Sequence, residues 1–300
     1  MMCLQSFRRR WVWILLAASG CLLAGTLHAQ PLRLKLHRLT SADKGSDQWQ
    51  EVETEAVWDP RGTAAVICDM WDRHWCKGAT ARVAEMAPRM NQVVTALRQR
   101  GALIIHCPSD TMKFYEGTGG RKLAQAAPQA ATKAPMRGWC SLDSVKEPPL
   151  PIDDSDGGCD DEPPCRQASP WRHEIATIEI REGDAITDST EAYNLMRERG
   201  ITNVIVMGVH QNMCILGRPF SIRQMVYQGQ HVALMRDLTD SMYNSRRKPF
   251  VDHFTGNDLV RWHIEKYWCP TISSDQIVGG QPFRFVSDTK PPRVFHSERP

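Results

Sequence analysis

Short apolar runs alternate with amphipathic segments along most of this chain. Apolar runs of the kind that form buried strands lie at residues 64–68, 102–105, 204–207 and 231–235. Apolar residues at helical spacing predict helices at 88–100, 189–199, 214–228 and 255–267, and glycines at 101, 200 and 229 end three of them. Weaker patterns predict strands at 176–180 and 272–278. Strands that alternate with helices predict βαβ units and a parallel sheet covered on both faces.

Two segments depart from this alternation. Residues 32–37 and 49–58 alternate apolar and polar positions with period two, which predicts an N-terminal β-hairpin. Residues 117–171 hold eight of the nineteen prolines and show little apolar periodicity, so they predict a long insertion, either a lid or a solvated loop. We therefore expect a hairpin extension at 30–60, one α/β domain with a mainly parallel sheet covered on both faces at 61–280, and a tail at 281–300.

The first 29 residues have the pattern of a secretory signal peptide: three arginines, an apolar run and a final Ala29. The apolar run is short for the ~20 residues that a membrane span needs. Removing this segment lowers Lys+Arg from 37 to 34 against 34 Asp+Glu, so the net charge becomes zero and gives no reason to expect a nucleic-acid partner. We expect a periplasmic or secreted protein with a small-molecule substrate and no membrane contact after cleavage; a homo-oligomer is allowed.

Eight cysteines follow the signal segment, and an oxidising compartment would allow disulfides. Cys159 and Cys165, in a polar loop, are the expected pair. Cys214 opens a helical pattern directly after a predicted strand, where the helix N-terminus is expected to lower the pKa of a thiol and make it a nucleophile. A buried structural cysteine is the alternative.

Asp69 follows the predicted strand at 64–68 in the same way. Residues that follow the strands of a doubly wound sheet meet at one edge, so Asp69 could take a proton from Cys214 and return it to a leaving amine. A helix cap or a solvated loop acid is the alternative for Asp69. Redox chemistry between Cys214 and Cys76 or Cys107 is a further alternative, but no C-x-x-C motif supports it.

Three segments resemble the isochorismatase-like cysteine hydrolases, which include nicotinamidases. Residues 64–70 are similar to that family's first strand with its aspartate, 208–214 to its glycine-to-nucleophile segment and 231–237 to its next strand. The resemblance implies a Rossmann-like three-layer α/β/α sandwich with Asp69 as general base and Cys214 as nucleophile. It also implies a cis peptide bond between Val209 and His210. Beside that bond, an oxyanion hole of backbone N–H groups is expected in the segment that contains Val209, His210, Met213 and Cys214.

The chain departs from that family at the third catalytic residue, a lysine at the end of the third strand. The stretch 178–184 contains no lysine, and Arg181 lies nearest, with Lys113 as a second candidate. A guanidinium supplies positive charge but does not titrate and is bulkier. The sequence therefore predicts an exported cysteine hydrolase that cleaves a small amide or related C–N compound through a thioester. The alternative is a catalytically inactive protein that binds a small ligand or a partner.

Aromatic and polar residues flank the predicted nucleophile and acid, and we expect them to line a substrate pocket: Trp71, His74, Trp75, His210 and Asn212. The two tryptophans are equally compatible with the core. Metal-using nicotinamidases carry an Asp-x-His after the second strand, and residues 106–112 lack it. His74, Cys76 and His106 could gather zinc, and the acidic residues at 153–162 could bind calcium, but such residues more often line pockets, pair or face solvent. We therefore expect no required cofactor.

Overall fold

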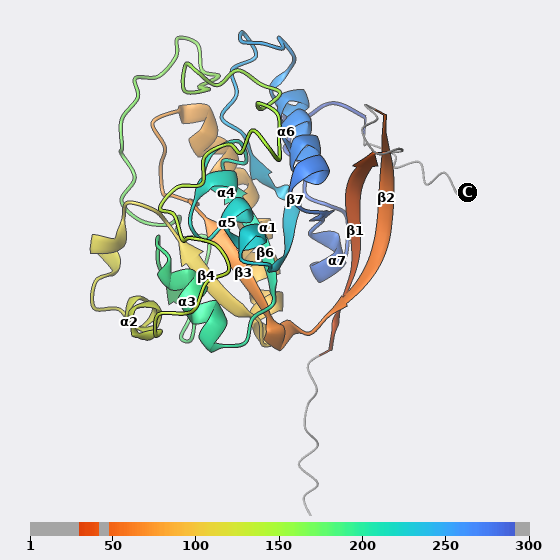
Figure 1. Cartoon of the computed structure of the whole chain (residues 1–300). Helices are drawn as coiled ribbons and strands as arrows, with labels where there is room; N and C mark the ends of the chain where they lie inside the picture. Colours follow the sequence, from red (N-terminus) through yellow and green to blue (C-terminus); the bar gives the residue numbers. More distant parts are fainter. Residues whose placement is uncertain (1–29, 42–47, 292–300) are drawn as a thin grey trace, which may run out of the picture.

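The computed structural model describes residues 30–41 and 48–291. Its strands form one sheet of eight in the order β2-β1-β8-β7-β6-β3-β4-β5 (Figure 1). The strands are β1 Leu32–Ser41, β2 Trp49–Trp58, β3 Thr63–Cys68, β4 Leu103–Cys107, β5 Ala185–Ile186, β6 Asn203–Val209, β7 His231–Asp240 and β8 Thr271–Ile272. The helices are α1 Lys77–Gln99, α2 Gly119–Ala126, α3 Glu191–Glu198, α4 Cys214–Gly217, α5 Ile222–Tyr227, α6 His253–Tyr267 and α7 Asp275–Val278, with short 3-10 turns η1 Pro60–Gly62 and η2 Met112–Tyr115.

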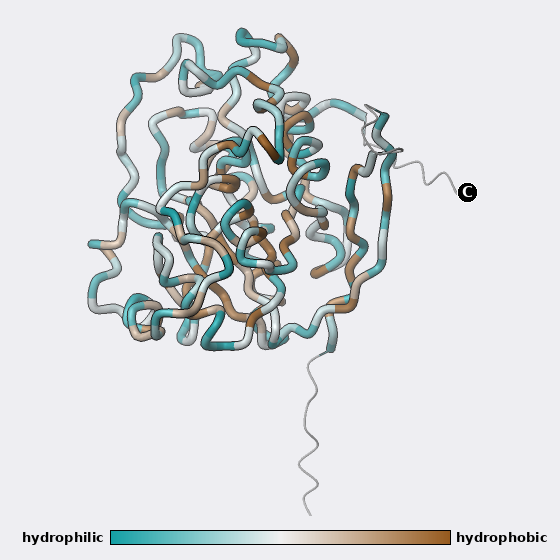
Figure 2. The backbone as a smooth tube through the Cα atoms, in the orientation of Figure 1, coloured by the Kyte–Doolittle hydropathy of each residue, from teal (hydrophilic) through white to brown (hydrophobic). Residues whose placement is uncertain are grey.

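The sheet has an apolar core on each face. Along β3, Ala64, Val66 and Cys68 pack into one cluster, and Ala65 and Ile67 pack into the other, as the two-residue period of a strand requires. Helices α3, α5 and α6 contribute to the first cluster, and α1 and α7 contribute to the second. The central strands are brown, or hydrophobic, in Figure 2 because both of their faces are covered. The expected three-layer α/β/α sandwich is confirmed.

The N-terminal hairpin is also confirmed, and it extends the central sheet. β1 and β2 pair antiparallel over ten residues, and β1 pairs with β8 through His37 and Thr271 at the right of Figure 1. Part of the expected tail lies on the core, since Phe285 is buried in the cluster beneath α1. The predicted signal peptide at 1–29 and the last residues, 292–300, lie outside the described residues. Within the described part, no helix is both long and apolar enough to cross a bilayer.

Some predicted boundaries are wrong. Residues 176–180 are not a strand, and the strand beside β4 is the two-residue β5. Helix α1 begins at Lys77 and contains Pro88, because apolar residues at helical spacing are already buried before the proline. The helix expected at 214–228 is divided into α4 and α5 at Pro219. The expected last strand is β8 followed by the short helix α7.

The insertion at 117–171 contains α2 and then follows a long irregular path, seen as yellow-green and green loops at the left and top of Figure 1. Five of its acidic residues each contact a different side chain of the protein. The contacts join Asp153 to Arg247 at 2.7 Å, Asp154 to Asn212 at 2.8 Å, Asp156 to Asn244 at 2.9 Å, Asp160 to Arg82 at 2.7 Å and Glu162 to Arg246 at 2.5 Å. These pairs connect the insertion to α1 and to the segments that follow β6 and β7. The acidic residues that could have bound calcium thus form structural contacts.

Candidate active site

Asp69 and Cys214 lie at the same edge of the sheet because β3 and β6 are parallel neighbours. Cys68, the last residue of β3, pairs with Gly208 of β6. Gly208 has φ +112°, and a Cβ on it would meet the Cys68 carbonyl oxygen at 2.0 Å. Only glycine permits this approach of the two backbones. The glycine ahead of the cysteine therefore brings the Cys214 segment to the end of β3, where Asp69 stands.

The Asp69 side chain is fully buried. Its Oδ1 accepts a hydrogen bond from the Ser109 N–H at 2.8 Å, which fixes the orientation of the carboxylate. Among the described residues, its Oδ2 has no hydrogen-bond partner. A buried carboxylate oxygen without a partner is rare in folded proteins and marks a place where a ligand or a proton is received.

Arg218 is the cation beside Asp69, and it is not among the residues predicted from the sequence. Its Nε lies 3.6 Å from Asp69 Oδ2, and its guanidinium lies 5.8 Å from the ring centre of Trp139 in the insertion. Pro219 explains the position, because a residue before proline avoids the helical conformation. Arg218 accordingly has φ −68° and ψ 153°, which ends α4. The Arg-Pro pair four positions after the cysteine was the available sequence signal.

The residues expected to supply positive charge lie elsewhere. The Arg181 side chain is 61% exposed and forms an ion pair with Glu179 at 2.5 Å. Its placement was inferred from a strand at 176–180 that does not form, so the structure does not bring it to Asp69 and Cys214. Lys113 is exposed on η2.

Burial and charge at the site favour the protonated form of the Cys214 thiol. Burial raises the pKa of the Cys214 thiol, and the Asp69 carboxylate raises it further, while Arg218 lowers it. Burial also raises the pKa of Asp69, and Arg218 opposes that rise. The expected lowering of the Cys214 pKa is therefore wrong. Helix α4 has only four residues, and the desolvation of a thiol beside a carboxylate outweighs its dipole.

The backbone before Cys214 contains the cis peptide bond that the family resemblance implies. The peptide bond between Val209 and His210 is cis. The His210 carbonyl accepts hydrogen bonds from the N–H groups of Met213 at 2.9 Å and Ile215 at 3.2 Å. The N–H of Cys214 itself has no acceptor among the described residues, so it is the donor left for an oxyanion.

Four of the five expected pocket residues come together in an aromatic group. Trp71 and Trp171 stack with ring centres 4.5 Å apart, and His74 stacks on Trp171 at 5.7 Å. Trp75 and His210 each contact His74, at 5.2 and 5.1 Å. Trp171 was not predicted, because it belongs to the proline-rich insertion and its partners are about a hundred residues away in sequence.

The two histidines of this group are uncharged at neutral pH. Burial lowers the pKa of His74 to about 4 and holds the pKa of His210 well below its usual value. The buried Nε2 of His210 has no partner within the described chain. The Nε2 atom of neutral His210 is therefore available for a hydrogen bond, four residues before Cys214.

Asn212, the fifth expected pocket residue, is not part of this aromatic group and forms three hydrogen bonds within the protein. Its amide nitrogen donates to Asp154 at 2.8 Å and to the Met242 carbonyl at 3.0 Å, and its oxygen accepts from the Met242 N–H at 2.9 Å. All three contacts tie the insertion and the end of β7 to the Cys214 segment. The amide of Asn212 therefore holds these segments together.

The residues that could have gathered zinc with His74 are separated. His106 is fully buried, and its two ring nitrogens contact Glu174 at 2.7 Å and Asp184 at 3.3 Å. Although burial acts to lower it, these carboxylates raise the pKa of His106 to about 9. Cys76 lies instead beside Cys159 and Asp161. The predicted disulfide is also absent, since the thiols of Cys159 and Cys165 are both free.

No family model matches the sequence, and no curated protein matches it. Solved structures resemble the chain at low identity. A cysteine hydrolase from Pseudomonas syringae pv. phaseolicola has a TM-score of 0.46 and 14% identity over 74% of this chain and 93% of that chain. N-carbamoylsarcosine amidase from Thermoplasma acidophilum has a TM-score of 0.38 and 13% identity, covering 71% and 96%. Pyrazinamidase from Pyrococcus horikoshii, in complex with zinc, has a TM-score of 0.36 and 15% identity, covering 69% and 97%.

Proposed function

We propose that this chain is an exported cysteine hydrolase, a divergent relative of the isochorismatase-like enzymes, that cleaves the C–N bond of a small amide or related compound. The observation that carries the proposal is the group of Asp69, Cys214 and Arg218, assembled at the ends of two parallel strands with a carboxylate oxygen left unpaired. Export is supported by the pattern of residues 1–29.

The acylation step follows from the charges at the site. In the resting protein the Cys214 thiol keeps its proton, because burial and Asp69 raise its pKa. As Sγ bonds to the amide carbonyl carbon, the proton passes to the Asp69 carboxylate and negative charge develops on the carbonyl oxygen, where the Cys214 N–H can donate. Asp69 then protonates the leaving nitrogen, the C–N bond breaks, and a thioester remains.

Deacylation uses the same groups in reverse. Asp69 takes a proton from water as the water oxygen attacks the thioester carbon. The S–C bond breaks, the carboxylic acid leaves, and the Cys214 thiolate recovers the proton from Asp69. Arg218 keeps its charge throughout, because the neighbouring anionic groups raise its pKa against the opposing effect of burial. It therefore stabilises the thiolate and the carboxylate without exchanging protons.

The test is turnover of a panel of small amides by the mature protein, measured as ammonia or amine release. The panel contains aromatic carboxamides, aliphatic amides and N-carbamoyl amino acids. We expect release by the wild type and a loss of at least about 1,000-fold in Cys214→Ala and in Asp69→Asn. Cys107→Ala is the matched control, because Cys107 is a buried free thiol at the end of the neighbouring strand β4.

A second measurement identifies the covalent step. Intact mass after rapid quenching should show the acyl group on the wild type and on Cys107→Ala, and none on Cys214→Ala. If the wild type gives neither product nor adduct across the panel while a panel compound raises its Tm, the chain is a binding protein and the hydrolase proposal is wrong.

A further inference from the structure

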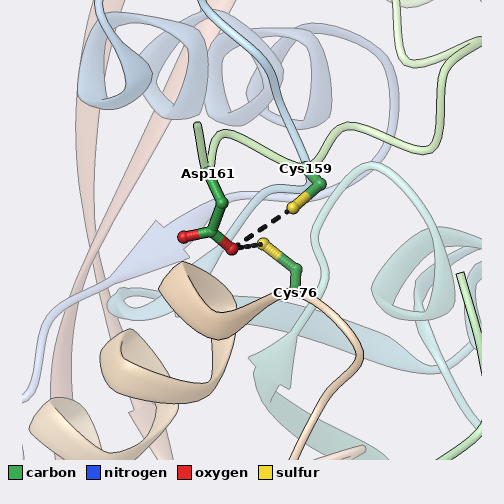
Figure 3. Close-up of side chains that lie close together, drawn as sticks. All are labelled: Cys76, Cys159 and Asp161. Atoms are coloured by element: carbon green, nitrogen blue, oxygen red, sulfur yellow. Dashed lines mark hydrogen bonds between the residues drawn. The ribbon is translucent and has the colours of Figure 1, made fainter. Parts of the chain in front are cut away.

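Three thiols converge on one carboxylate oxygen at the start of α1. The Sγ atoms of Cys76, Cys159 and Cys165 lie 3.3, 3.4 and 3.2 Å from Asp161 Oδ2. Figure 3 shows two of these thiols, Cys76 from the helix start and Cys159 from the insertion, pointing at the same oxygen. Three thiols from two separate parts of the chain thus contact the same oxygen atom, Asp161 Oδ2.

The distances match the edges of a metal-centred tetrahedron. With Zn–S bonds of about 2.3 Å and a Zn–O bond of about 2.0 Å, sulfur and oxygen ligands of tetrahedral zinc lie about 3.5 Å apart. The observed separations of 3.2 to 3.4 Å are close to that value. The ligand atoms of Cys76, Cys159 and Asp161 also lie within 4.8 Å of one another. The side chains of Cys76, Cys159 and Asp161 are therefore already spaced as ligands. Cys165, which is partly exposed, is the fourth candidate ligand because its Sγ lies 3.2 Å from the shared Asp161 oxygen.

The surroundings suit a buried anionic metal centre. Cys76 and Cys159 are 0% and 2% exposed, and Met242 and Ala79 pack beside them. Asp161 Oδ2 also accepts the Lys77 N–H at 2.8 Å and the Gly78 N–H at 3.2 Å. Three thiolates and a carboxylate around Zn²⁺ carry a net charge of −2. The N-terminus of α1 and Arg246, which donates to the Asp161 carbonyl at 3.0 Å, offset that charge.

We propose that Cys76, Cys159, Cys165 and Asp161 bind a thiophilic divalent cation, with zinc as the natural occupant. Binding displaces the three thiol protons and forms three metal–sulfur bonds and one metal–oxygen bond, without oxidation or reduction. Four protein ligands complete the coordination of zinc, so the site is structural. It fastens the 159–165 turn of the insertion to α1, and Met213, the residue before the nucleophile, packs against it.

The site differs from the one that metal-using nicotinamidases carry. Its ligands come from the residue before α1 and from the insertion, and none lies in the stretch at the end of β4 and directly after it, residues 106–112, where those enzymes carry their Asp-x-His. Arg218, Asp69 and Cys214 are not ligands. Metal binding and hydrolysis are therefore separable, and the metal proposal stands whether or not the chain cleaves amides.

The experiment uses the reduced mature protein and Co²⁺ as a spectroscopic substitute for Zn²⁺. We expect one equivalent of Co²⁺ to bind with intense thiolate-to-cobalt and tetrahedral absorption bands, and one equivalent of Zn²⁺ to abolish them. Cys159→Ser and Cys76→Ser should weaken binding by at least about 100-fold. Cys140→Ser is the control, because Cys140 is another buried free thiol of the insertion and contacts Gln224.

A second measurement does not depend on how well the variants fold. Removal of zinc from the wild-type protein with a chelator should lower the Tm, and added Zn²⁺ should restore it. Absence of Co²⁺ binding by the reduced wild type would overturn the proposal, as would bands that persist in the Cys76→Ser/Cys159→Ser double variant. A disulfide between any two of the three cysteines in the protein as isolated from its own compartment would overturn it too.

Discussion

Arg218, the residue that ends α4 before Pro219, places its Nε 3.6 Å from Asp69 Oδ2. The separation is an ion pair without a hydrogen bond, and among the described residues both atoms lack a hydrogen-bond partner. A fixed positive charge thus faces Asp69, the residue that we propose as the general base. It takes the place that the sequence analysis had given to Arg181.

Replacing Arg218 should change both the rate and its pH dependence. Burial raises the pKa of Asp69 and Arg218 opposes that rise. The proposed mechanism needs Asp69 as the carboxylate. Activity should therefore fall as the pH decreases through a pKa above the ordinary 3.8, and Arg218→Met should move that limb to higher pH. We expect kcat/KM to drop about 100-fold in Arg218→Met and less in Arg218→Lys. The measurement is a pH profile of kcat/KM on the best amide of the panel.

Arg181→Met is the control for that experiment. Its guanidinium is exposed and paired with Glu179, so the profile should match the wild type. A large loss of activity in Arg181→Met, with Arg218→Met unaffected, would contradict the site described above.

Gly208→Ala should destabilise the protein severely. The new Cβ would meet the Cys68 carbonyl oxygen at 2.0 Å, at a backbone φ of +112°. Gly183→Ala is the matched control, since Gly183 has φ +88° with no atom within 4 Å of an added Cβ. We expect losses of about 1–2 kcal/mol for Gly183→Ala and at least about 3 kcal/mol for Gly208→Ala in urea unfolding. Equal losses would show that β3 and β6 do not approach as closely as described.

The free energy of unfolding should decrease between pH 6.5 and about 9. The pKa of His106 is about 9 in the folded protein against 6.5 for an ordinary histidine, so its contribution is fully present below pH 6.5 and is lost as the pH rises. The upper limit of that contribution is roughly 3 kcal/mol. Urea unfolding across this range should show the decrease in the wild type and a flatter curve in His106→Gln. Parallel curves for the two proteins would show that His106 is uncharged.

Asn212→Ala separates a structural role from a pocket role. The substitution leaves the Met242 N–H, the Met242 carbonyl and Asp154 without their partner, so we expect a loss of about 2–3 kcal/mol in the free energy of unfolding. KM should stay close to the wild-type value at temperatures where the variant is folded. An increase in KM with unchanged stability would instead return Asn212 to the substrate pocket.

The order of strands and helices was readable from the sequence because burial on both faces of a parallel strand requires a continuous apolar run. That requirement is local, so the strands that became β3, β4, β6 and β7 were identified along with the two residues that follow β3 and β6. The short β5 was not, since two buried residues are too few to show a pattern. The single helix predicted at 214–228 was also wrong, because Pro219 divides it into α4 and α5.

The sequence by itself thus determined the layered fold and the pairing of Asp69 with Cys214, because adjacent parallel strands deliver their following residues to one edge. Only the tertiary structure decided which cation stands there, that Trp171 completes the aromatic group, and that three cysteines meet at Asp161. Each of these depends on where an irregular segment crosses the sheet. Irregular segments are positioned by contacts between residues distant in sequence, and no periodicity along the chain records such contacts.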